Sequence, residues 1–142
     1  MQASTTQPVL FVSHGGGPLP LLHDPEHAEL LLTYALIRQK LDALQPPPSA
    51  LLFISAHWET AEPTLTAAAR PPLLFDYYGF PPQSYQLRYP VDGAPALAGR
   101  LAEQLQALGW VAHLDSTRGL DHGVFVPGML LFPRADIPCL QL

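Results

Sequence analysis

The chain has 142 residues, of which 48% are hydrophobic and 13% charged, with a net charge of −5. This composition predicts one globular domain over residues 1–142 and excludes an extended basic surface for nucleic acid. No apolar run reaches the roughly 18 residues of a membrane-spanning helix. The single cysteine, Cys139, excludes an intrachain disulfide and favours a reducing, cytoplasmic setting.

The first third of the chain predicts a strand followed by a helix. The apolar run Val9–Ser13 is typical of a strand buried on both faces. Asp24 is a candidate helix cap, Pro25 suits the first helical position, and the prolines at 46–48 end the helix. Apolar side chains recur at helical spacing over this stretch, at Leu30, Tyr34, Ile37, Leu41 and Leu44.

The rest of the chain continues this alternation. Residues 70–90 are rich in aromatics and predict a long irregular segment. The next helix has a predicted buried apolar stripe, formed by Leu97, Leu101, Leu105 and Leu108. Gly109 is its predicted C-terminal cap. The predicted elements are strands at Ala50–Ser55, Thr64–Ala68, Val111–Leu114 and 138–142, and helices at Ala94–Leu108 and Val124–Leu131. This order predicts a three-layer α/β/α fold with a mostly parallel sheet.

Two histidines stand at the ends of two predicted strands. His14 follows the first strand and precedes three glycines, and His57 follows the second strand. Ligands of open α/β sheets bind beyond the carboxyl ends of such strands. Each histidine alone is more often structural, but the pair at equivalent positions predicts a shared metal site.

The remaining candidates point less directly to chemistry. His122 lies in a turn beside Asp121, which could orient an imidazole. His23 and His27 have the spacing of helical zinc ligands, but no glutamate follows His23 as in a His-Glu-x-x-His motif, so we expect surface residues. We expect His113 to be structural, Cys139 to be a small buried apolar residue, and Tyr77, Tyr78 and Phe80 to pack or line a pocket.

The run His14-Gly15-Gly16-Gly17 is also similar to the oxyanion-hole loop of α/β-hydrolase esterases. That interpretation requires a Gly-x-Ser-x-Gly nucleophile elbow, which the chain lacks. Ser55 and Ser84 have the wrong neighbours for such an elbow. No phosphate-binding glycine loop is present in the sequence either.

Several motifs in order resemble those of one family. They are 13–18 (SHGGGP), 55–59 (SAHWE), 76–81 (DYYGFP), 85–90 (YQLRYP) and 119–123 (GLDHG). Together they resemble the class III extradiol ring-cleavage dioxygenases, in the branch related to 4,5-DOPA dioxygenase. The resemblance covers nearly the whole chain.

The resemblance implies a site that holds non-haem Fe(II), or Zn(II), and cleaves a catechol next to its two oxygens with O2. His14 and His57 match two metal ligands, and His122 matches an active-site histidine that contacts substrate or oxygen. Tyr78 is the accompanying substrate-binding candidate. Imidazoles suit these metals, and three facial ligands leave positions free for catechol and O2.

The resemblance also implies a longer family chain. The third metal ligand and the acid/base histidine have no counterpart here, so Glu59, Asp76, Asp121 or a water would have to complete the coordination. A fold that is truncated relative to the family exposes a sheet edge and an apolar face, which predicts a homo-oligomer. The alternative to an enzyme is therefore a non-enzymatic metal-binding remnant that self-associates.

Overall fold

The computed structural model describes residues 7–142, which fold into helices and short parallel strands. In chain order the α-helices and strands are α1 (Ala28–Asp42), β1 (Leu51–Phe53), β2 (Thr64–Thr66), α2 (Pro95–Ala107), β3 (His113–Asp115), α3 (His122–Leu131) and β4 (Cys139–Gln141). Short 3-10 helices lie at η1 (Leu19–Leu22), η2 (Pro25–His27) and η3 (Pro82–Gln86). Over the described range, no helix has the length and apolar character that crossing a bilayer requires.

The strands form two parallel pairs, β1 with β4 and β2 with β3. The Gln141 N–H of β4 donates to the Thr66 hydroxyl of β2 at 2.8 Å. Where the two strand pairs meet, the Thr66 hydroxyl thus accepts a backbone N–H that a backbone carbonyl would accept in a continuous sheet. The predicted parallel α/β fold is confirmed, but the described strands do not form one continuous ladder.

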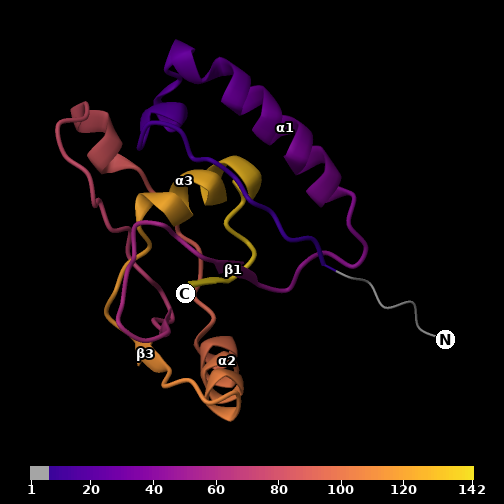
Figure 1. The fold of residues 1–142 in the computed structure, drawn as a ribbon. Coiled ribbons are helices and arrows are strands. Elements are labelled where there is room, and N and C mark those ends of the chain that lie inside the picture. The colour runs from indigo at the N-terminus through magenta and orange to yellow at the C-terminus, as the bar shows by residue number, and fades with distance from the viewer. Residues whose placement is uncertain (1–6) are drawn as a thin grey trace.

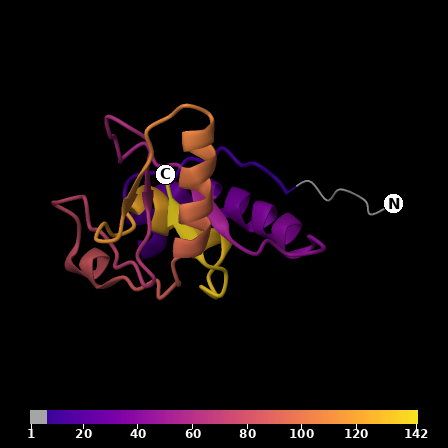
Figure 2. The ribbon, with the colours of Figure 1, turned by 90° about the horizontal axis from the view of Figure 1, so that it is seen from below.

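Helices cover both sides of these strands. Helices α1 and α3 lie on one side of β1 and β4, and α2 lies on the other (Figure 1). The view turned by 90° looks onto α2 with the strands behind it (Figure 2). The core divides accordingly: Phe125 of α3 packs in one cluster with Cys139, whereas Ala98 of α2 packs in another with Leu65 and Leu140. This arrangement, with helices on both sides of the strands, agrees with the predicted α/β/α layers.

The predicted first strand at Val9–Ser13 does not form. Among the described residues no strand pairs with this segment, and Val9 and Phe11 are almost fully exposed. An apolar run indicates side chains that can be buried, but a strand also needs a neighbour to take its backbone hydrogen bonds. The segment is an extended arm that ends at His14.

Helix α1 begins later than predicted. Residues 25–27 form the 3-10 turn η2, and the Asp24 side chain makes no cap hydrogen bond, because its carboxylate pairs with His27 Nδ1 at 2.7 Å. The predicted apolar stripe is confirmed, since Tyr34 and Leu41 are buried against Leu131 of α3.

The other two helices differ from prediction at their ends. Leu108 was expected in the buried stripe of α2 but is 76% exposed, because the helix ends at Ala107 and Gly109 turns the chain at φ +90°. Helix α3 starts at His122, two residues earlier than predicted. It is apolar on all sides because it is buried between α1 and β1–β4.

Candidate metal centre

Three imidazoles converge at one point of the fold. His14 ends the N-terminal arm, His57 follows β1, and His122 is the first residue of α3. One nitrogen from each ring lies within 4.8 Å of the others, and His14 Nε2 and His57 Nε2 are 2.8 Å apart. The ring centroids are 4.0–4.9 Å apart. Side chains separated by more than a hundred residues thus meet in the arrangement of a metal-ligand set.

The environment of His14 favours a neutral imidazole. Burial lowers the pKa of His14 below the usual 6.5, and the neighbouring His122 and His57 rings lower it further. His14 Nδ1 is buried and has no hydrogen-bond partner among residues 7–142. Metals bind histidine in its neutral form, so this ring is prepared to act as a ligand near neutral pH.

His57 is positioned through a buried polar network. The Ser55 hydroxyl accepts the His57 backbone N–H at 3.1 Å and donates to Asp121 Oδ1 at 2.7 Å. The other Asp121 oxygen accepts bonds from Arg118 and from the Gln141 side-chain amide. The loop after β1 is thereby attached to the residue that precedes α3.

A glycine allows His57 and α3 to approach each other. A β-carbon at Gly123 would collide with Ser55 Oγ and come within 2.9 Å of His57 Cδ2. Only a residue without a side chain fits between the network and the ring. The glycine that follows His122 is therefore required by close packing at the site.

His122 is oriented by a carboxylate distant in sequence. Asp76 Oδ1 lies 2.7 Å from His122 Nδ1 and also accepts the His122 backbone N–H at 3.1 Å. Burial acts to raise the pKa of Asp76, but these hydrogen bonds from His122 outweigh it and lower the pKa below its usual value. Because the carboxylate only accepts, Nδ1 carries the proton and Nε2 is left free. The residue that orients His122 is therefore Asp76 and not Asp121.

The remaining candidates lie outside the three-histidine cluster. Tyr78 is 92% exposed, and Tyr77 is the tyrosine whose ring lies 5.7 Å from His122. Cys139 is buried, and burial raises the pKa of its thiol to about 12. His113 is exposed beside Glu62. Within residues 7–142 the ligand cluster contains three histidines and none of the carboxylates considered from sequence.

The two histidines expected at the surface differ from each other. His23 is exposed, as predicted. His27 is not a surface residue: its side chain is 14% exposed, and its Nε2 accepts the Gly16 N–H at 2.9 Å. The prediction failed because it weighed His27 only as a partner of His23, whereas Asp24 and the glycine loop hold it.

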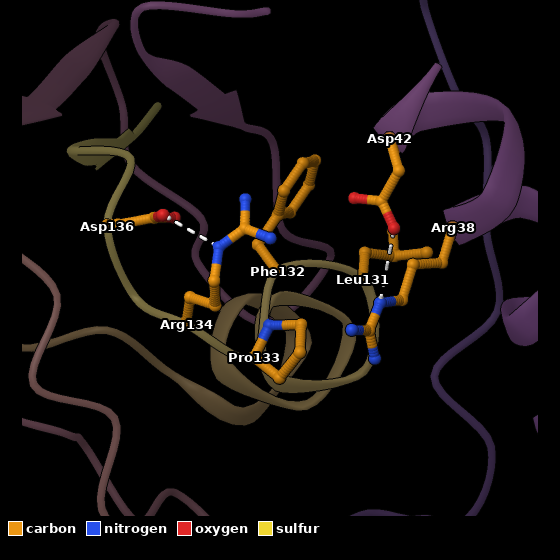
Figure 3. Close-up of a pocket in the computed structure, with 7 residues that line it drawn as sticks. All are labelled: Arg38, Asp42, Leu131, Phe132, Pro133, Arg134 and Asp136. Atoms are coloured by element: carbon orange, nitrogen blue, oxygen red, sulfur yellow. Dashed lines mark hydrogen bonds and ion pairs between the residues drawn. The ribbon is translucent and has the colours of Figure 1, made fainter. Parts of the chain in front are cut away.

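A small hollow elsewhere in the fold carries no comparable cluster. It lies where the end of α3 meets α1, and its arginines face carboxylates (Figure 3). Arg38 is 3.7 Å from Asp42, and Arg134 is 2.8 Å from Asp136. Such exposed pairs balance charge and contribute little to stability. None of the three histidines lines this hollow.

Comparison with known proteins identifies the family to which this chain belongs. Residues 8–142 match the family model described as the catalytic LigB subunit of aromatic ring-opening dioxygenase. The chain belongs to the LigB family. The matched range contains the three histidines, Asp76 and the Asp121 network, so the whole site lies within the LigB match.

Curated relatives show how much of a LigB-family protein the chain represents. It is 49% identical over 140 residues to the dioxygenase tasH of Hapsidospora irregularis, covering 95% of this chain and 43% of the relative. It is 37% identical over 142 residues to 4,5-DOPA dioxygenase extradiol of Escherichia coli K12, covering 100% of this chain and 49% of the relative. The chain therefore spans less than half the length of these relatives.

A solved structure has a fold similar to that of this chain. The crystal structure of an uncharacterized Escherichia coli K12 protein superposes with a TM-score of 0.56 at 32% sequence identity. The superposition covers 78% of this chain and 38% of that chain. The α/β arrangement is thus shared with a longer solved protein.

Proposed function

We propose that this chain forms the metal-binding part of an extradiol dioxygenase that opens a catechol ring with O2. The observation that carries the proposal is the convergence of His14, His57 and His122 in a chain of the LigB family. The names of its relatives, a dioxygenase and 4,5-DOPA dioxygenases, support a DOPA-like aromatic diol as substrate.

The donor set fits Fe(II) or Zn(II). Neutral imidazoles suit both ions, the lowered pKa of His14 fits a neutral ligand, and its Nε2 is the atom that meets His57 Nε2 at 2.8 Å. When bound, either ion would supply Lewis-acid polarisation of the catechol oxygens, and Fe(II) would also supply the redox chemistry that O2 requires, which redox-inactive Zn(II) does not. The cytoplasm, proposed from the single cysteine, would keep iron in its ferrous form.

In this proposal the three histidines divide two tasks. His14 and His57 hold the metal, since their Nε2 atoms lie together at 2.8 Å. His122 keeps its proton on Nδ1 against Asp76, so its free Nε2 can accept a proton or a hydrogen bond from a catechol hydroxyl. Tyr78 stays a predicted substrate contact from the exposed aromatic segment.

The proposed activity predicts turnover after anaerobic Fe(II) loading. DOPA and simpler catechols are added, followed by O2, and the yellow ring-opened product is monitored by absorbance while an electrode measures O2 uptake. We expect both signals, and we expect their loss in His57→Ala. O2 uptake without ring-opened product, or neither signal across the catechols, would reject ring cleavage by this chain.

Exposed apolar side chains favour a second candidate function, in which the chain is a metal-binding module that self-associates and is not itself an enzyme. Large apolar side chains are exposed on the arm and just after β1, including Phe11, which is fully exposed, and Ile54, which is 77% exposed. Burying such side chains between copies would remove apolar surface from water. We expect light scattering at micromolar concentration to show a dimer or larger species. A stable monomer would count against self-association.

A further inference from the structure

His27 lies beneath the glycine loop that follows His14. Its Nε2 is 2.9 Å from the Gly16 nitrogen, and its Nδ1 is 2.7 Å from Asp24 Oδ2. A backbone amide can only donate, so Nε2 must accept and the ring proton must reside on Nδ1. That proton is donated to Asp24. The tautomer of His27 is therefore fixed by its two partners.

The loop is shaped to the His27 ring. Gly15 has φ +76°, and a β-carbon there would come within 2.6 Å of His27 Cδ2 and 2.9 Å of Leu30 Cδ2. The glycine therefore provides both the left-handed backbone and the space that the ring occupies. The chain on the other side of His14 is also attached, because the Tyr34 hydroxyl donates to the Ser13 carbonyl at 2.8 Å.

We propose that His27, held by Asp24, is a positioning residue for His14. It lies outside the three-histidine cluster and acts through the Gly16 amide, fixing the backbone from which the His14 ring projects. Groups that hold a ligand in place commonly change metal affinity 10–100-fold when they are removed. The proposal rests on the metal site of the proposed function, and it adds two residues to that site.

Metal affinity of the 142-residue chain tests this role. Zn(II) alone is titrated by calorimetry into wild type, His27→Phe and His27→Gln, with His113→Phe as a matched control at an exposed histidine. Phenylalanine keeps a ring but removes the acceptor, so we expect affinity to fall about 10–100-fold. Glutamine offers an oxygen to Gly16 and should recover most of that loss, while His113→Phe should bind like wild type.

A measurement on the metal-free wild type tests the contact between His27 and Gly16 without requiring any variant to fold. A proton–nitrogen NMR correlation spectrum of wild-type imidazoles should show the His27 proton on Nδ1, and a proton on Nε2 would overturn the proposal. Equal Zn(II) affinity in His27→Phe and wild type, or equal loss in both His27 variants, would also overturn it. Wild type without Zn(II) affinity would reject the proposed metal site itself, a different result from either of these.

Discussion

Replacing Asp121 with alanine should lower the free energy of unfolding by about 3–5 kcal/mol. The Asp121 side chain has no solvent exposure, and both of its oxygens are occupied by partners from three parts of the chain. Its loss leaves the buried Ser55 hydroxyl and Gln141 amide without their acceptor, and leaves the partly buried Arg118 guanidinium without its carboxylate partner. Unpartnered buried polar groups each cost about 1–3 kcal/mol, so the effect exceeds that of one hydrogen bond.

Urea unfolding of the metal-free chain measures this change, with Asp136→Ala as the control. Asp136 also pairs with an arginine, Arg134, but both side chains are largely exposed. The control should therefore change stability by less than about 1 kcal/mol. If Asp121→Ala were no more destabilising than Asp136→Ala, the network would not hold the β1 loop and α3 together.

The sequence predicted those helices whose apolar spacing and end residues lie within the helix itself or directly beside it. The α1 stripe around Tyr34 follows helical spacing, and Gly109 ends α2 because only a few residue types adopt its positive φ readily. The arm at residues 9–13 was mistaken for a strand because pairing depends on a partner that the segment itself does not encode. The same limit explains why the junction of β2 and β4 at Thr66 was not predicted.

The same difference between local and long-range information applies to the candidate site. His14, His57 and His122 were singled out from the sequence because each lies in a short motif with distinctive neighbours, and the structure brings their rings together. The residues that orient them were not found, since Asp76 meets His122 across 46 positions and no periodicity links the two. For His27 the sequence did contain a local signal. Asp24 precedes it by three residues, and both residues follow shortly after the glycine loop.

In the proposed site, His14 and His57 together hold one metal ion. Their Nε2 atoms are 2.8 Å apart, so one ion can bind both nitrogens in place of the direct hydrogen bond between them. Removing either ring takes away a direct ligand, a larger loss than that of a positioning group. We expect His14→Ala and His57→Ala each to weaken metal binding by more than about 100-fold.

The most direct test is the metal content of purified wild type, His14→Ala, His57→Ala and the exposed-site control His23→Ala, after equal loading with Fe(II) or Zn(II) and removal of free metal. The structure predicts near-stoichiometric metal in wild type and His23→Ala, and little or none in the other two variants. Full metal content in both His14→Ala and His57→Ala would show that the pair is not the ligand set.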